Sequence, residues 1–206
     1  MEKQSIDRAL RAVRKLNEIR HKQDQKIDIL CNDMVSANRD IIEQLNLLTS
    51  AVNFYESITG QTDISNLLDI AAGHIRHMVK NSNVAVFLTD SNGFEIHMAD
   101  DSPIEIDKKQ FESYFTPEVV NDICRSSRVC SIEDMCNIGL QANPAVLSSI
   151  SAAAVPLGRF TQPVGFILIY RKAENNLTAE ELEKVTTITP GLRNAITACR
   201  EMVTTS

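Results

Sequence analysis

The chain has no tryptophan, and aromatic residues make up only 5% of its 206 residues. Few rings are therefore available to stack against a flat cofactor. A glycine-rich phosphate loop, the zinc-protease motif H-E-x-x-H and the hydrolase motif G-x-S-x-G are also missing from the sequence. The sequence thus indicates no catalytic residue and requires no cofactor.

Long apolar runs are missing as well. No stretch approaches the roughly 20 apolar residues of a membrane span, and the amino terminus lacks the apolar core of a signal peptide. The five cysteines are an odd number and form no C-x-x-C pair. We therefore expect reduced thiols, a cytoplasmic location and no membrane contact.

An excess of basic charge is missing, except near the amino terminus. The chain carries 21 Lys or Arg and 27 Asp or Glu, for a net charge of −6. Residues 1–26 reverse this balance, but acidic residues interleave with the basic ones and no aromatic side chain accompanies them. We read this segment as a solvated helix flank and do not expect a nucleic-acid partner.

Residues 1–59 contain neither glycine nor proline and carry a continuous heptad pattern. At the two core positions of the heptad, seven of eight and six of eight residues are apolar. An apolar seam of period 3.5 needs a partner helix, so we predict a coiled coil and a homodimer. The predicted dimerisation residues are Ile6, Val13, Ile27, Leu30, Met34, Ile41 and Leu48.

A polar segment interrupts this seam at residues 20–26, where Arg20 and Gln23 occupy core positions. Two interpretations remain open: a continuous helix whose polar layer sets the register, or a helix that breaks and folds back there. Gly60 is the first glycine, and we expect it to end the helix. We therefore predict a helical coiled-coil segment over 1–59 and a second domain over 60–206.

Beyond Gly60, helix and strand patterns follow one another. A helix capped by Asp63 or Ser65 is predicted first, and Pro190-Gly191 is expected to kink the last helix without ending it. Residues 133–147 are predicted to form a long loop or a frayed helix. Strands are predicted over 83–90, 94–99, 129–132, 149–157 and 163–171, a loop over 100–107, and further helices over 108–115, from Thr116 and from Thr178.

Four segments of the second half carry a family resemblance. They are Arg128-Val-Cys-Ser-Ile-Glu-Asp134, Ser148-Ser-Ile-Ser-Ala-Ala-Ala-Val-Pro-Leu157, Gly165-Phe-Ile-Leu-Ile169 and Thr178-x-x-Glu181-Leu182. With the order of elements around them, they resemble the GAF domain, a small-molecule sensor module of many bacterial signalling proteins. The resemblance covers roughly residues 62–202. It implies an α+β fold with an antiparallel sheet of five or six strands and helices on both sides, here preceded by a long amino-terminal helix.

The resemblance also implies a function. In GAF domains, loops and short helices between strands two and four close a pocket on one face of the sheet, and flanking helices commonly dimerise in parallel. It implies a non-catalytic cytoplasmic sensor or adaptor that binds a small ligand or senses redox state and relays the change through a dimeric coiled coil to a separate output protein. The implied ligand-binding residues are Phe87, Phe115, Cys130, Met135, Cys136, Ser149 and Ser151.

The sharper signatures of the family are missing. No Cys-His dipeptide is present for bilin attachment, and the Asn-Lys and Phe-Asp motif of cyclic-nucleotide-binding relatives is absent. Cys124, Cys130 and Cys136 recur every six residues, which suits a thiol redox pair or a soft metal site. Methionine-sulfoxide-reducing relatives use cysteines in this region, but the acid they carry before Val-Pro is replaced by alanine, as at Ala152.

Two histidines complete the candidates, but His74 and His77, three residues apart, have no evident third ligand, so we predict no metal site. The alternatives to a sensor are a thiol-based redox enzyme related to methionine sulfoxide reductases and a purely structural coiled-coil dimerisation protein.

Overall fold

The computed structural model describes residues 2–90, 93–98, 113–159 and 162–204. Residue contacts divide the chain into two compact units, Met1–Leu48 and Thr49–Ser206. The elements are α1 (Glu2–Ile58), α2 (Ile64–Met78), β1 (Asn83–Asp90), β2 (Gly93–Met98), α4 (Pro117–Arg125), β3 (Cys130–Ser131), α5 (Ile132–Ile138), α6 (Pro144–Ser149), β4 (Ile150–Arg159), β5 (Gln162–Lys172) and α7 (Ala179–Thr204). The predicted loop over 100–107 and most of the predicted helix over 108–115 lie outside the described residues.

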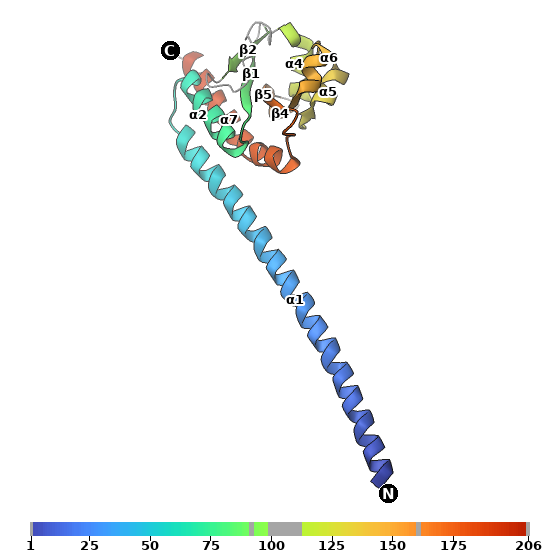
Figure 1. Ribbon diagram of the computed structural model, residues 1–206. Helices are drawn as coiled ribbons and strands as arrows, with labels where there is room; N and C mark the ends of the chain where they lie inside the picture. The colour runs from blue at the N-terminus through green and yellow to red at the C-terminus, as the bar shows by residue number, and fades with distance from the viewer. Residues whose placement is uncertain (1, 91–92, 99–112, 160–161, 205–206) are drawn as a thin grey trace. The chain divides into compact units, whose positions relative to one another are not determined.

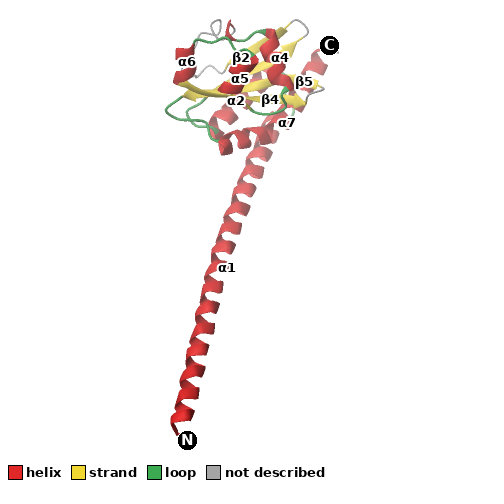
Figure 2. Ribbon diagram, turned by 90° about the vertical axis from the view of Figure 1, so that its right-hand side faces the viewer, coloured by secondary structure: helices red, strands yellow, loops and turns green. Residues whose placement is uncertain are grey.

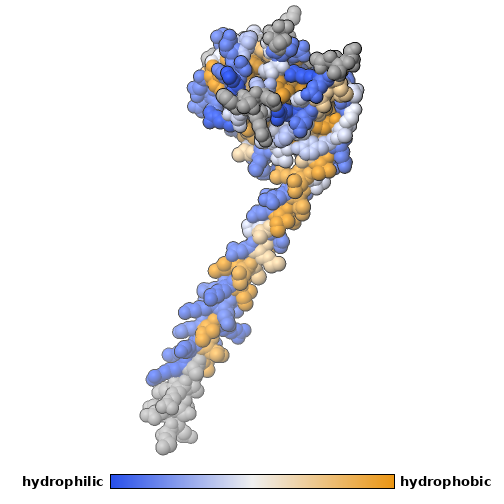
Figure 3. Space-filling view, turned by 180° about the vertical axis from the view of Figure 1, so that it is seen from behind, coloured by the Kyte–Doolittle hydropathy of each residue, from blue (hydrophilic) through white to orange (hydrophobic). Residues whose placement is uncertain are grey.

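The first unit consists of α1 up to Leu48. Residues 20–26 are helical, so the polar segment does not break the helix. The described side chains of the predicted seam, from Val13 to Leu48, are 54–69% exposed, and apolar residues recur along α1 in Figure 3. The side chain of Ile6 lies outside the described ones. α1 ends at Ile58, and Gly60 follows with a φ of +81°, the left-handed conformation expected just past a helix end.

The second unit is built on one antiparallel sheet of five strands in the order β2-β1-β5-β4-β3. β1 and β2 form a hairpin, as do β4 and β5. β5 lies in the middle of the sheet and is buried from Val164 to Arg171, because both faces of the sheet are covered. The predicted α+β fold with an antiparallel sheet is confirmed (Figure 2).

Helices cover both faces of this sheet, as predicted (Figure 1). On one face, α2, α7 and the last turns of α1 pack against alternate strand residues such as Val86 and Ile167. On the other face, α4 and α5 pack against the intervening residues, such as Ala85 and Leu168. Since neighbouring residues of a strand point to opposite faces, β1 and β5 touch both hydrophobic cores.

α7 runs through Pro190, as predicted, because its neighbours satisfy the carbonyls of this turn. A proline has no N–H to donate to the carbonyl four residues earlier, which here belongs to Thr186. The hydroxyl of Thr189 donates to that carbonyl at 2.9 Å. The hydroxyl of Tyr55, near the end of α1, donates to the carbonyl of Thr187 at 3.0 Å.

An ion pair between buried Arg171 and half-buried Glu181 connects β5 to the start of α7. The guanidinium of Arg171 donates to both carboxylate oxygens of Glu181, at 3.0 and 2.7 Å. Burial alone would raise the pKa of Glu181, but the hydrogen bonds from Arg171 and Thr178 lower it below its usual value. The pattern Thr178-x-x-Glu181 forms a capping box, in which the Thr178 hydroxyl accepts from the N–H of Glu181 and the Glu181 carboxylate accepts from the N–H of Thr178. Arg171 also donates to the carbonyls of Lys80, Asn175 and Asn176.

The segment around β3 differs from the prediction. The strand is only Cys130–Ser131, and two short helices, α5 and α6, lie where a long loop or frayed helix was expected. Ser131 ends the strand because its hydroxyl caps α5, accepting from the N–H of Asp134, while the Asp134 carboxylate accepts from the N–H of Ser131.

Candidate functional site

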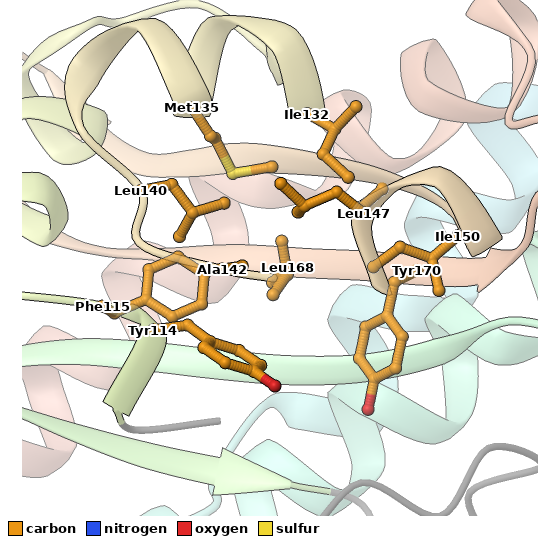
Figure 4. Close-up of a pocket in the computed structure, with 11 residues that line it drawn as sticks. Tyr114, Phe115, Ile132, Met135, Leu140, Ala142, Leu147, Ile150, Leu168 and Tyr170 are labelled. Atoms are coloured by element: carbon orange, nitrogen blue, oxygen red, sulfur yellow. The ribbon is translucent and has the colours of Figure 1, made fainter. Parts of the chain in front are cut away.

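A small cavity of about 30 Å³ lies on the face of the sheet that α4 and α5 cover. Side chains from two strands form its floor, and side chains from the segments around α5 and α6 close it (Figure 4). Its lining residues are Tyr114, Phe115, Ile132, Met135, Leu140, Ala142, Leu147, Ile150, Ala152, Leu168 and Tyr170. None of the eleven is charged, so the cavity suits an uncharged ligand.

Strand register places the floor residues together. Ala152 of β4 lies opposite Tyr170 of β5, and Ala154 lies opposite Leu168. Such directly opposed residues have Cβ atoms about 5 Å apart and share a face. Ala152 and Ala154 of β4 and Phe166, Leu168 and Tyr170 of β5 therefore lie on the cavity side of the sheet. Val155, Leu157, Ile167 and Ile169 lie on the side that α7 covers.

Local turns bring in the closing residues. Ile132 and Met135 are three apart on α5 and so point to one side of the helix. Gly139 ends α5 with a φ of +114°, and the N–H of Leu140 then donates to the carbonyl of Met135 at 3.0 Å. This left-handed turn directs the chain back over the floor, so that Leu140 closes the cavity beside Met135 (Figure 4).

Aromatic rings pack the adjoining part of this core. Phe87 stacks on Phe166 with ring centroids 4.4 Å apart, and Phe115 contacts Phe87 at 4.7 Å. Phe115 is also a lining residue, so this cluster of rings borders the cavity. The cavity volume of about 30 Å³ is small, since a single water molecule needs roughly 10–15 Å³. The cavity therefore admits only one or two small groups unless side chains move. Leu140 and Leu147 belong to short segments outside the sheet, which can shift without breaking strand pairing.

The structure brings together only part of the predicted ligand-binding set. Phe115 and Met135 line the cavity, and Phe87 lies in the same core cluster. Cys130 is buried in that cluster, with its Sγ 3.2 Å from the hydroxyl of Ser126. The remaining three do not line it: Cys136 and Ser149 are exposed, and Ser151 accepts a hydrogen bond from the N–H of Leu177 on the α7 side.

The three evenly spaced cysteines lie in different environments. Cys124 is buried, and burial raises the pKa of its thiol to about 12, so the reactive thiolate is scarce. Cys130 is also buried, whereas Cys136 is exposed. Among the described residues, no three or more His, Cys, Asp or Glu side chains are grouped to hold a metal ion.

The histidines lie outside the cavity. The Nε2 of His74 is 3.4 Å from the Ser50 hydroxyl, and its ring packs on Phe54 at 5.0 Å. Burial, followed by the charge of His77, lowers the pKa of His74. His97 contacts Asp69 at 2.9 Å.

None of the described helices has the length and apolar character needed to cross a bilayer.

Of the eleven lining residues only Phe115 and Met135 were predicted, and two kinds of unpredicted residue show why. Tyr170 and Leu168 were part of the predicted strand, but nothing in the nearly uniform apolar run indicates which of its residues face the cavity. The second is Asn83, beside Tyr170 in the register of β1 and β5. It is 2% exposed, and neither its amide nitrogen nor its amide oxygen has a hydrogen-bond partner. Each such unsatisfied group costs about 1–3 kcal/mol.

No model of a known protein family matches the sequence, and no curated protein matches it. Solved structures do match its fold. The GAF domain/HD domain protein from Geobacter sulfurreducens superposes with a TM-score of 0.57 at 18% identity, covering 69% of this chain and 97% of that one.

Two further matches are the GAF domains of phosphoenolpyruvate-protein phosphotransferases. The Coxiella burnetii domain has a TM-score of 0.58 at 11% identity, covering 78% of this chain and 98% of its own. The Acinetobacter domain has a TM-score of 0.53 at 11% identity, covering 75% and 94%. Together with the sheet order and the two-sided helical cover, these matches show that the chain has a GAF-like fold.

Proposed function

We propose that this chain is a non-catalytic signalling sensor in which the second unit binds a small uncharged ligand and α1 relays the change within a homodimer. The observation that carries the proposal is the exposed apolar seam of α1. Its described members, from Val13 to Leu48, are 54–69% exposed in the single chain. An exposed apolar stripe of this length, interrupted only at residues 20–26, is typical of a partner contact.

The core of the second unit supports a relay from the cavity to α1. Leu168 of β5 faces the cavity, whereas its neighbours Ile167 and Ile169 pack in the opposite core with Phe54 and Ile58 of α1. Since one strand contributes to both cores, a ligand that displaces Leu168 also shifts side chains that hold the last turns of α1. We propose that the seam transmits this shift to an output partner.

The dimer is tested by changing Ile27, Leu30 and Ile41 together to Lys. Light scattering of the native chain should give the mass of two 22.9 kDa chains, and the triple variant should give one. The matched control is Lys at Gln25, Asn32 and Ser36, which are exposed positions off the seam and receive three added side chains of the same kind. A monomeric native chain, or an unaltered mass of the seam variant, would refute the dimer.

Ligand binding is tested by a thermal-shift screen of small uncharged compounds. A ligand at 100 times its Kd stabilises the native state by about 2.7 kcal/mol, so a binder raises the Tm measurably. Ala152→Leu fills the cavity floor and should abolish the shift, whereas Cys136→Leu, at an exposed position of α5, should leave it unchanged. The proposal fails if no compound raises the Tm, or if the shift survives Ala152→Leu.

A further inference from the structure

Asn83 is a buried polar side chain without a partner. In the described part of the chain, four polar or charged side chains are buried: Ser82, Asn83, Arg171 and Thr189. The Ser82 hydroxyl donates to the carbonyl of Val79 at 2.6 Å, and Thr189 and Arg171 have the hydrogen bonds described above. Only the amide of Asn83 lacks a bond at both its nitrogen and its oxygen. Buried amides are almost always hydrogen-bonded, so this exception needs an explanation.

The position of Asn83 relates it to the cavity. Along β1, the odd-numbered residues Ala85 and Phe87 belong to the core that surrounds the cavity, and Asn83 has the same parity. Asn83 lies opposite Tyr170 of β5, which in turn lies opposite Ala152 of β4. Tyr170 and Ala152 both line the cavity. The amide is therefore one strand beyond the present cavity floor, on the same face of the sheet.

Tyr170 lines the cavity and lies directly opposite Asn83 in the sheet. In Figure 4, Tyr170 extends from β5 toward β1, away from Leu147 and Met135. Contact between a ligand in the cavity and Asn83 requires this one side chain to rotate. Because the cavity holds only about 30 Å³ as it stands, a ligand needs such a movement in any case.

We propose that the carboxamide of Asn83 is the polar contact of the ligand, and that the ligand is a small uncharged molecule with an amide-type edge. An Asn side chain offers an acceptor oxygen and a donor nitrogen side by side, which an N–H next to a C=O complements in both directions. The uncharged wall excludes ions, and the rings of Tyr114, Phe115 and Tyr170 that line the cavity suit a planar apolar body. The inference rests on the proposed ligand binding in this cavity.

The test uses benzamide, which has a ring and a carboxamide, and toluene, which has a similar ring and methyl group but no hydrogen-bonding atoms. NMR follows the Met135 methyl group as a reporter of the cavity and the Asn83 side-chain NH₂ as a reporter of the contact. Benzamide should shift both resonances, and toluene only that of Met135. Asn83→Leu should weaken benzamide binding about tenfold or more and leave toluene binding unchanged or tighter.

Ser82→Ala is the matched control, because it removes the adjacent buried polar group, whose hydroxyl already has a partner. It should leave both affinities unchanged. If Asn83→Leu does not fold, the test uses the Asn83 side-chain NH₂ resonance of the native chain alone. Benzamide must shift this resonance, and the inference is wrong if it does not.

The outcomes separate this inference from the proposed function. If toluene binds and benzamide does not, or if both bind and Asn83→Leu changes neither, the inference is wrong and the ligand-binding cavity stands. If neither compound shifts the Met135 resonance, both the inference and the proposed cavity are refuted.

Discussion

Two helical glycines are predicted to respond in opposite directions to the same change. Replacing Gly191 of α7 by Ala should destabilise the fold, whereas replacing Gly73 of α2 by Ala should stabilise it. A Cβ built at Gly191 meets the ring of Tyr55 at 2.0 Å, but a Cβ at Gly73 meets nothing within 4 Å. The difference depends on whether Tyr55 packs into the notch at Gly191 as described.

The expected magnitudes follow from three contributions. Forcing a methyl group into a filled contact costs typically 1–3 kcal/mol, and displacing Tyr55 also removes its hydrogen bond to the Thr187 carbonyl, which contributes about 1 kcal/mol. Ala is more favourable than Gly in a helix by about 1 kcal/mol. Gly191→Ala should therefore lower the free energy of unfolding by about 1–3 kcal/mol, and Gly73→Ala should raise it by up to about 1 kcal/mol.

The assay is urea unfolding followed by circular dichroism, with all variants at one protein concentration because α1 is proposed to dimerise. Tyr55→Phe isolates the hydrogen bond and should cost about 1 kcal/mol. In a Tyr55→Ala background the obstructing ring is gone, so Gly191→Ala should become stabilising, like Gly73→Ala. Equal stabilisation by Gly191→Ala and Gly73→Ala in the native background would refute the described packing of Tyr55.

Two further predictions concern titration and thiol reactivity. Because burial and His77 lower the pKa of His74 below 6.5, the unfolded chain binds a proton more readily, so the stability due to neutral His74 is complete above pH 6.5 and falls below it. The pH dependence of unfolding should flatten in His74→Gln, and an identical profile would contradict the burial of His74. A thiol reagent should modify exposed Cys31 and Cys136 in the native chain and Cys124 only after denaturation, whereas rapid modification of Cys124 would revive the redox alternative.

Elements with strong local signals were predictable from the sequence. β1 spans Asn83–Asp90 as expected, because a β-branched run is followed there by turn residues. Thr116 caps α4, with Pro117 at the first helical position, and Asp63 caps α2. These caps are contacts between residues at most three apart, so the local sequence is sufficient to predict them.

The short helices beside the cavity were harder to predict. α5 spans only seven residues of mixed polarity and carries too few turns to show a helical period. Its start depends on a capping box formed by Ser131 and Asp134, and its position depends on burial of Met135 against the sheet. The box is visible in the sequence, but the packing that makes so short a helix stable is a tertiary contact.

The face of each strand was the least predictable feature of the site. β4 and β5 are covered on both sides, so apolar residues occupy consecutive positions and no alternation reveals which ones face the cavity. Ser151 was therefore predicted as a lining residue, although it faces α7 and its neighbour Ala152 lines the cavity. The polar residue Asn83 begins β1, but its position opposite Tyr170 is a property of the assembled sheet, so its polarity alone could not identify the cavity-facing residues of β5.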